Sequence, residues 1–528
     1  LRVPATIAEI RDPVLIPVLG ATGNVIEVEA MSAQFIDRKG QRMWSLDFTG
    51  DDLIGRVQQQ FERGGLVELL CLPIALPIAL DRKRAAQSMA TARRGFFLHL
   101  ADLRPSSSAL DLVGATGSER TETANLLAVL KTKAISYLEQ LVVQRLNIVG
   151  LDKFPLLRLL IRFTVLQSLS SGRVDHAPGR LHGMVIGPPG QGKKLVGLAA
   201  RALNPICEQV SPTKVSAAGL VGASHHSDSG WVSQPGAIPR ATGGVVVLQD
   251  AHGWDRSTVR KIAPILQEVM EDGEATDAVS GGIKRTAEAA LLFDLNRTSH
   301  VRPTGVAVAP GAEAAILQVR PVLSRMDLLC EIPPDVERAW EVARRLYKSM
   351  KTGHAPLDEQ PWVRQARLII AELRDRHREV DLDPARDQME EAHTQIQKAN
   401  EKLFNDRPEM GDVPARMAIS FARLVSASAR SRDSSVANSD DVARASVFVS
   451  MKLSFLSMTA RSWTPADGKW RGSVAQWVAQ YRGEEVSTAD VKDAYEKATG
   501  RTADERTFRR ALLRLGENRG KGKYYLPP

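Results

Sequence analysis

The chain has 528 residues, a formal net charge of +9 and three cysteines, with 43% hydrophobic and 25% charged side chains. At roughly 100–200 residues per domain, this length predicts three or four domains with substantial cores. The three cysteines lie far apart, which excludes a four-cysteine zinc site and indicates a reducing compartment, so we expect a cytoplasmic protein. No apolar run reaches the roughly 20 residues that span a bilayer, so we expect no membrane partner, and the basic charge favours an anionic one.

The first part of the chain is predicted to be rich in strands. Residues 14–35 alternate apolar and polar side chains, and glycines interrupt the region, which is typical of short strands joined by turns. We expect a strand-rich N-terminal domain over 1–120, forming a small barrel that could be OB-like. A basic segment, 82–94, is flanked by apolar runs and is expected to be an exposed loop.

Helical periodicity follows from about 122 to 171. Strands and helices then alternate to about residue 330, which predicts a parallel α/β sheet. We assign this core to 121–334 and a helical lid to 335–460. A linker near 463–468 leads to a small separate domain, 471–528.

A glycine-rich turn follows a short apolar strand at 181–186 and precedes an apolar helix at 195–203. Its residues are Gly187, Pro188, Pro189, Gly190, Gln191, Gly192, Lys193 and Lys194. The pattern GxxxxGK between a strand and a helix is specific for a loop whose backbone N–H groups wrap nucleotide phosphates. We therefore predict ATP binding here, with Lys193 reaching the β- and γ-phosphates.

Lys194 departs from this pattern. The residue after the lysine is normally Ser or Thr, whose hydroxyl binds Mg²⁺. An ammonium cannot bind a cation and repels it, so Mg²⁺ binding or hydrolysis is weakened unless water or a neighbouring group compensates.

Further segments occur in a fixed order along the chain: VSAAGL at 215–220, GW at 230–231, PGA at 235–237, GGVVVLQDAH at 243–252 and LSRMDL at 323–328. Their order and spacing resemble the minichromosome-maintenance (MCM) helicases. The resemblance covers about 148–450, more than half of the chain. It implies an AAA+ P-loop ATPase core that uses ATP and Mg²⁺.

In the MCM family an apolar strand ends in Asp-Glu, where the Asp organises Mg²⁺ and the Glu polarises the attacking water. Alignment on 243–244 puts Gln249 at the Asp position and Asp250 at the Glu position. A slip of one residue would instead make Asp250 the metal ligand. Either way one carboxylate remains where two are expected, and Asp250 could also be a simple helix cap.

Three further residues match catalytic positions of the family. Asn296 follows an apolar segment and matches the asparagine that orients the attacking water. Arg325 matches the arginine finger, and Arg416 matches the sensor arginine of the lid, seven residues before Arg423. An arginine finger enters the site of a neighbouring subunit, so the resemblance implies a homo-oligomeric ring, by precedent a hexamer.

The resemblance also implies two hairpins that project into the channel of the ring, at 224–231 and 277–286. Lys284 or Arg285 in the second could bind phosphates of single- or double-stranded DNA. His225 and His226 have no accompanying ligand cluster, so a metal site there is disfavoured. The zinc module common in the family's N-terminal collar lacks its cysteines here.

The last domain predicts a winged helix. Ser487 and Thr502 open two helices with capping patterns, and a basic turn with two tyrosines follows the second. Arg509 and Arg510 on the second helix, and Lys521 in the wing, are predicted DNA contacts. A protein-binding winged helix is the alternative.

These features predict a ring-forming DNA helicase or translocase that couples ATP hydrolysis to unwinding in replication, with replication-initiation proteins as partners and a mobile element as one setting. The alternative is a hydrolysis-deficient DNA-binding or assembly protein that uses nucleotide as a structural switch, which Lys194 and Gln249 favour. A chelatase or protein-remodelling enzyme shares the fold, but the C-terminal pattern and basic charge argue against it.

Overall fold

Most of the chain is described by the computed structural model. The described residues are 2–10, 14–19, 25–37, 42–47, 57, 66–73, 96–105, 109, 113, 115–146, 154–174, 177–211, 215–227, 230–276, 284–296, 315–350, 356–404, 412–463, 474, 478, 481, 485–499, 504–520 and 523–526.

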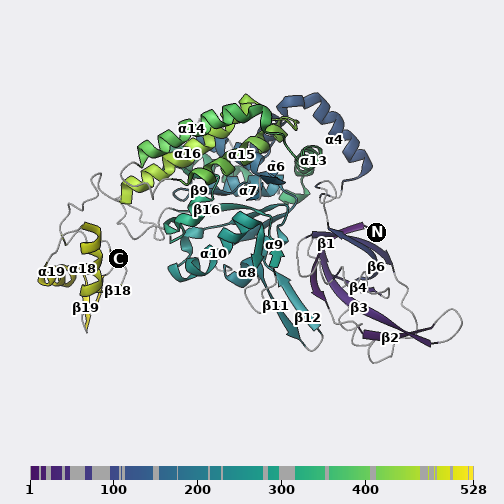
Figure 1. The fold of residues 1–528 in the computed structure, drawn as a ribbon, viewed down its shortest axis with the longest axis horizontal. Helices are drawn as coiled ribbons and strands as arrows, with labels where there is room; N and C mark the ends of the chain where they lie inside the picture. Colours follow the sequence, from purple (N-terminus) through teal and green to yellow (C-terminus); the bar gives the residue numbers. More distant parts are fainter. Residues whose placement is uncertain are drawn as a thin grey trace.

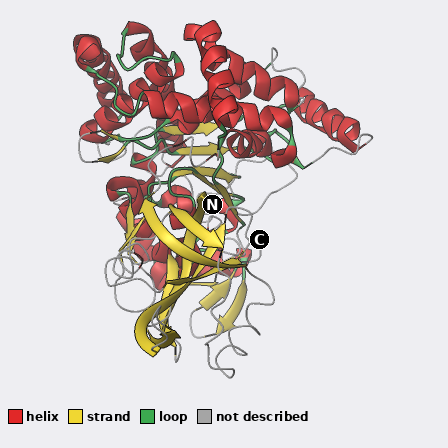
Figure 2. Ribbon diagram, turned by 90° about the vertical axis from the view of Figure 1, so that its right-hand side faces the viewer, coloured by secondary structure: helices red, strands yellow, loops and turns green. Residues whose placement is uncertain are grey.

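The described N-terminal strands lie together in one region of the molecule (Figures 1 and 2), and their pairing forms a closed cycle. They are β1 (Arg2–Ile10), β2 (Val14–Leu19), β3 (Val25–Asp37), β4 (Arg42–Asp47), β5 (Leu66–Pro73) and β6 (Phe96–Pro105). β1 pairs with β5 and β3, and the pairs β5–β6, β6–β4 and β4–β3 complete the cycle. β2 pairs with the first part of β3, residues 25–30, whereas the later part of β3 pairs with β1 and β4. The strand-rich region is as expected, and its OB-like character stays a prediction.

Three helices lead from these strands to the core: α4 (Gly117–Leu130), α5 (Ala134–Arg145) and α6 (Pro155–Leu169), with the 3-10 turn η1 (Lys131–Lys133) between the first two. Thr116 and Glu119 form a capping box at the start of α4, so the helical region begins slightly before the predicted residue 122. In α6, the ring of Phe163 lies 5.7 Å from that of Phe448, which ties this helix to the lid.

The centre of the molecule is a sheet of parallel strands in the order β10–β13–β16–β9–β17. The strands are β9 (Gly183–Ile186), β10 (Cys207–Val210), β13 (Val245–Leu248), β16 (Ala290–Leu295) and β17 (Leu328–Glu331). β13 and β16 are buried at every position, as expected when both faces of a parallel sheet are covered. The predicted parallel α/β core is confirmed.

Two helices cover opposite faces of this sheet. Val245 and Val247 pack with α7 (Lys193–Leu203), whereas Val246 and Leu248 pack with α10 (Arg256–Asp272). Residues of β13 therefore alternate between two cores. Short elements complete this region: α8 (Ala217–Val221), α9 (Ala237–Arg240), α11 (Arg320–Ser324), η4 (Ala251–Gly253) and η5 (Ala315–Gln318).

Hairpins extend from the core. β11 (Gly222–Ser227) pairs with β12 (Gly230–Pro235), which confirms the first predicted hairpin, and β12 meets β1 where Val232 lies opposite Glu9. In the second, β14 (Glu274–Thr276) pairs with β15 (Lys284–Thr286), and 277–283 lie outside the described residues. A short pair, β7 (Arg173–Val174) with β8 (Ala177–Pro178), precedes β9.

The lid is helical, as expected (Figure 1). It consists of α12 (Val336–Met350), η6 (Leu357–Glu359), α13 (Pro361–Arg376), η7 (Asp383–Ala385), α14 (Arg386–Leu403), α15 (Pro414–Ser431) and α16 (Ser439–Trp463). Lys452 of α16 is buried with its Nζ 2.6 Å from Asp412 Oδ2. The same ammonium donates to the Ser324 carbonyl at 3.0 Å, so the lid is fixed to the turn that carries Arg325.

The C-terminal elements are β18 (Glu485–Ser487), α18 (Thr488–Thr499), α19 (Glu505–Leu515), β19 (Glu517–Gly520) and β20 (Lys523–Tyr525). The strands pair in the order β18–β20–β19. The Ser487 hydroxyl accepts from Asp490 N at 3.1 Å, as the predicted cap requires, and α19 begins after an Asp504 cap. The ring of Phe508 packs on Tyr495 in the small core.

Among the described helices, none combines the length and apolar character needed to cross a membrane.

Candidate nucleotide-binding site

The glycine-rich loop joins β9 to α7 at the carboxyl edge of the sheet. Gly190 and Gly192 have φ of +79° and +86°, a region that L side chains rarely adopt. Gly187 is constrained differently, because a Cβ there would lie 2.9 Å from the Ile332 carbonyl oxygen. Gln191 is buried and its Nε2 donates to the Asp335 carbonyl at 3.0 Å. The loop thus has the strand–turn–helix form that the sequence predicts.

Lys193 is the first residue of α7 and its side chain turns back under the loop. Its Nζ donates to the carbonyls of Gly187 (2.7 Å) and Pro188 (2.8 Å) and to Asn296 Oδ1 (3.0 Å). Burial lowers the pKa of Lys193, and the nearby carboxylates of Asp294 and Asp250 oppose this shift. The structure therefore brings Lys193, Asn296 and Asp250 into one site, as the sequence analysis expects.

Lys194 lies beside Lys193 in sequence but is exposed. Its charge still acts on the site, because it contributes to lowering the pKa of Lys193 and opposes the rise in the pKa of Asp294. The repulsion of a cation predicted for Lys194 therefore stays a prediction.

Asn296 follows β16 and contacts a histidine that the sequence analysis did not assign to the site. The Asn296 backbone N–H donates to His252 Nδ1 at 3.2 Å, and Asn296 Nδ2 lies 3.1 Å from His252 Nε2. Burial lowers the pKa of His252, which favours the neutral ring. His252 therefore orients the asparagine. In the sequence, the only indication of this role was the position of His252 directly after Gln249, Asp250 and Ala251.

Gln249 and Asp250 follow β13. The Gln249 backbone N–H donates to the Val210 carbonyl at 2.9 Å, so the strand pairing continues through Gln249. Asp250 turns away with a φ of +48°. Although Asp250 precedes a 3-10 turn, its side chain forms no capping hydrogen bond. The helix-cap alternative for Asp250 is therefore not supported.

Asp294 is a second carboxylate at the site that the sequence analysis missed. It lies in β16, two residues before Asn296, and only 6% of it is exposed. Burial raises the pKa of Asp294 to about 6, against the attraction of Lys193 and with a further rise from Asp250. The sequence feature that could have pointed to Asp294 is that it is a single aspartate inside the apolar run 289–295.

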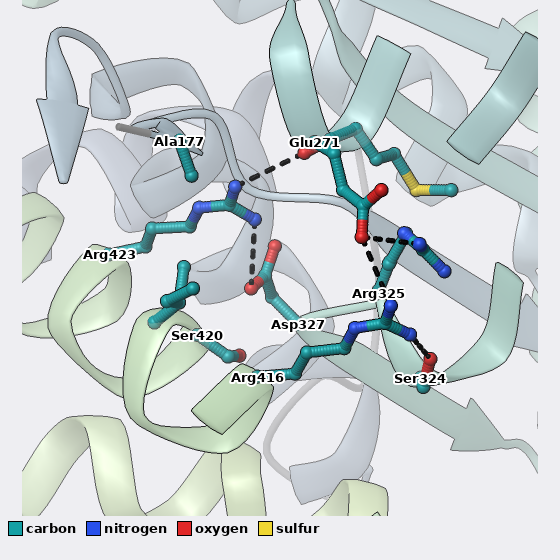
Figure 3. A pocket seen from close by; sticks show the side chains of 10 residues that line it. Ala177, Glu271, Ser324, Arg325, Asp327, Arg416, Ser420 and Arg423 are labelled. Carbon is teal, nitrogen blue, oxygen red and sulfur yellow. Dashed lines mark hydrogen bonds and ion pairs between the residues drawn. The ribbon is translucent and has the colours of Figure 1, made fainter. Parts of the chain in front are cut away.

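Arg325 and Arg416 meet in a separate pocket (Figure 3). Both guanidinium groups contact Glu271, Arg416 at 3.0 Å, and Arg416 also donates to the Ser324 hydroxyl at 2.6 Å. Burial, and then the charge of Arg416, lowers the pKa of Arg325. Two cations therefore share one carboxylate, which is itself 46% exposed, and the cluster has net positive charge.

Buried contacts fix this arginine cluster in place. Arg423 of the lid lies 3.7 Å from Asp327 and donates to the Met270 carbonyl at 3.3 Å. Asp327 accepts from the His182 backbone N–H at 2.7 Å, which connects the lid helix α15 to the start of β9. Arg423 is 5% exposed, so its role is to position the elements that carry Arg325 and Arg416.

The predicted DNA-binding residues differ in exposure. Lys284 is exposed and 3.3 Å from Glu274, whereas Arg285 is 1% exposed. Successive strand residues point to opposite faces, so Arg285 is turned into the protein and only Lys284 of this pair faces solvent. Arg509 and Arg510 are both exposed on α19, and Lys521 lies outside the described residues.

Comparison with known proteins gives a match at the level of fold. Neither protein-family profiles nor curated protein sequences matched this chain. Among solved structures, the crystal structure of a full-length MCM homolog from Methanopyrus kandleri is similar, with a TM-score of 0.51. The similarity covers 86% of this chain and 77% of that one, at 18% sequence identity.

This chain has an MCM-like fold. The match covers most of the chain, so it includes much more than the parallel sheet. Among the residues that the structure describes, no group of three or more His, Cys, Asp or Glu side chains could hold a metal ion. A cation bound at the edge of the sheet would therefore need oxygen atoms from a ligand in addition to carboxylates.

Replacing Asp294 tests whether its buried carboxylate lowers the stability of the protein. Because the folded pKa of about 6 exceeds the unfolded value of 3.8, the contribution of Asp294 to stability is largest below pH 3.8 and is lost as the pH rises through 6. We expect Asp294→Asn to unfold at higher temperature than wild type above pH 6, with a gain on the order of 2 kcal/mol that shrinks toward pH 4.

Thermal unfolding across pH 5–8 in the presence of a chelator measures this gain. The exposed helix cap Asp255→Asn is the matched control and should give no comparable gain. An Asp294→Asn protein that is no more stable than wild type at pH 8 would contradict the account of this carboxylate.

Proposed function

We propose that this chain is an ATP-driven DNA helicase or translocase that assembles into a ring and acts in replication, including that of a mobile element. The observation that carries the proposal is the contact of Lys193 with Asn296 at the end of the sheet, within an MCM-like fold. A lysine from the loop and an amide from a neighbouring strand meet where the phosphates of ATP would lie. We also propose that the ring is a hexamer and that replication-initiation proteins are its partners.

ATP binding would use the loop 187–194. Its backbone N–H groups and the start of α7 favour anions. The Lys193 ammonium bonds only neutral oxygens among its described partners, so a triphosphate offers it better acceptors. We expect Lys193 to exchange the loop carbonyls for β- and γ-phosphate oxygens when ATP binds.

The residues present fit a magnesium ion at the phosphates. Asp250 is half-buried and its carboxylate is not used to cap the following turn. When bound, Mg²⁺ would neutralise charge on the phosphate oxygens. Asp250 would hold the ion or polarise the attacking water, and Asn296, oriented by His252, would position that water.

Arg325 and Arg416 would act on the ATP of a neighbouring subunit. They form one cluster with Glu271, built by α10, α11 and α15, whereas Lys193 starts α7 and Asn296 follows β16. In the single chain Glu271 compensates part of their charge. A triphosphate brought by a neighbour would supply the stronger counter-charge, so ring assembly would complete the site.

DNA contact would come from Lys284 in the second hairpin and from Arg509 and Arg510 on α19. All three are exposed cations. The order strand–helix–helix–strand–strand at the C-terminus, with three paired strands, supports a winged helix whose second helix presents the two arginines. Arg285 is left out of this proposal because its side chain is buried.

A second candidate is a hydrolysis-deficient protein in which ATP acts as a structural switch for assembly or DNA binding. The observation that favours it is the end of β13, where the polar side chain before Asp250 is the neutral Gln249. This candidate predicts ATP binding without turnover.

Lys193→Ala tests the proposed function. We expect wild-type protein to hydrolyse ATP faster when single-stranded DNA is present, and the variant to bind ATP about 10–100-fold more weakly, because charge-assisted bonds to phosphate are lost. Calorimetric ATP titration and phosphate release are the measurements. An exposed lysine of α10, outside the loop, gives the control, and Lys261→Ala should retain ATP affinity.

Equal ATP affinity of Lys193→Ala and wild type would overturn the site. Tight ATP binding by wild type without any turnover would make the switch the better description.

Mixing two inactive variants tests the action of Arg325 between subunits. Lys193→Ala lacks its own loop lysine and Arg325→Ala lacks its finger, so each alone should lose most turnover. When equal amounts of the two subunits assemble at random into mixed rings, about a quarter of the interfaces would combine an intact loop with an intact Arg325. We expect turnover to recover to a corresponding fraction of wild type. No recovery, although mixed rings are shown to form, would contradict action in trans.

A further inference from the structure

The end of β13 lacks a carboxylate on the face that covers the loop helix. Val247 of β13 packs with α7, and a Cβ at Gly197 of that helix would lie 3.4 Å from it. Strand residues two apart point to the same side, so Gln249 continues this row toward the phosphate loop. A neutral amide therefore stands where a metal-organising carboxylate would be useful.

Asp294 lies beside Gln249 on the adjacent strand. β13 and β16 are parallel, and their last registered pair is Leu248 with Phe293. The next residue on each strand is Gln249 and Asp294, at the same level of the sheet. Leu292, two residues before Asp294, packs in the same core as Val247, so both polar side chains lie on the α7 face. The sheet places a carboxylate one strand away from the expected position.

No described contact within the protein accounts for the burial of Asp294. Its Oδ1 is fully buried and has no hydrogen-bond partner among the described residues. Lys193 is close enough to influence it but directs its Nζ to Gly187, Pro188 and Asn296 instead. A buried carboxylate oxygen without a hydrogen bond is costly, and such an atom at the edge of a ligand site indicates a missing partner.

We propose that Asp294 binds the divalent cation that accompanies ATP, in place of the carboxylate missing at Gln249. The inference rests on the proposed ATP site. Mg²⁺ is usually held by one or two carboxylates together with phosphate oxygens and water, and Asp294 with Asp250 supplies that number. The ion would be held from β16 and from the turn after β13, whereas no hydroxyl from the loop helix is needed.

This assignment also accounts for Lys194. With no hydroxyl ligand expected from the start of α7, the residue after Lys193 need not be Ser or Thr and can be an exposed lysine. The charge of Lys194 also acts on Asp294, so the carboxylate would offset part of its repulsion of the cation.

The test compares ATP affinity with Mn²⁺ and with EDTA by calorimetric titration of the full chain. Wild type should bind ATP at least about tenfold more tightly with Mn²⁺, a gain of roughly 1.4 kcal/mol. Asp294→Asn should lose most of this gain and keep its affinity in EDTA. Binding of Mn²⁺ can also be measured directly, because the electron paramagnetic resonance signal of free Mn²⁺ decreases when the ion binds to the protein.

A variant that moves the carboxylate from β16 to the end of β13 gives the decisive control. In Asp294→Asn/Gln249→Asp, the carboxylate stands on the neighbouring strand at the same level, and the Mn²⁺ dependence should return. Unchanged Mn²⁺ dependence in Asp294→Asn, loss of its ATP affinity in EDTA, or no rescue by Gln249→Asp would overturn the proposal. Absence of ATP binding by wild type in both conditions would instead show that the underlying ATP site is wrong.

Discussion

The ammonium of Lys193 is the contact on which the candidate site depends. It draws together the carbonyls of Gly187 and Pro188, at the end of β9, and the amide of Asn296, at the end of β16. Such a contact is possible because parallel strands all end at the same edge of the sheet, where ligands of this fold class bind. The positive φ of Gly190 and Gly192 lets the loop turn over the lysine. The remaining polar groups of the site, Asp250 and Asp294, are arranged around this charge.

Two buried ion pairs of the lid contrast with Asp294, whose Oδ1 has no hydrogen-bond partner among the described residues. In the lid, Lys452 has both Asp412 and the Ser324 carbonyl as partners, and Arg423 has Asp327. These pairs are costly to break because each would leave an unpaired charge. They hold the turn of Arg325 rigidly against the core. The lid thus uses paired charges for structure, whereas at the sheet edge Asp294 keeps a buried oxygen without a hydrogen bond, which a ligand can satisfy.

Local sequence patterns predicted the parts of the site that are continuous in the chain. The strand–glycine turn–helix around Lys193 was predicted from the GxxxxGK pattern between an apolar strand and a helix, and Asn296 from the resemblance to the MCM helicases. Asp294 and His252 were not, because their importance arises only from the register of β13 against β16 and from a turn that brings His252 to Asn296. The burial of Arg285 was missed for a related reason: in the three residues of β15, the sequence does not say which face is covered. The closed cycle of N-terminal strands likewise depends on β1 pairing with both β3 and β5, which alternation alone cannot specify.

Hydrogen exchange of the loop amides tests the central claim without requiring hydrolysis. On addition of ATP to the full chain, the account predicts slower exchange at the backbone amides of 190–193, because they would bond phosphate oxygens. Exchange in the lid segment 386–403 should change less. If ATP leaves the loop amides unchanged and protects another part of the chain, the phosphates do not bind at this loop and the proposed site is wrong.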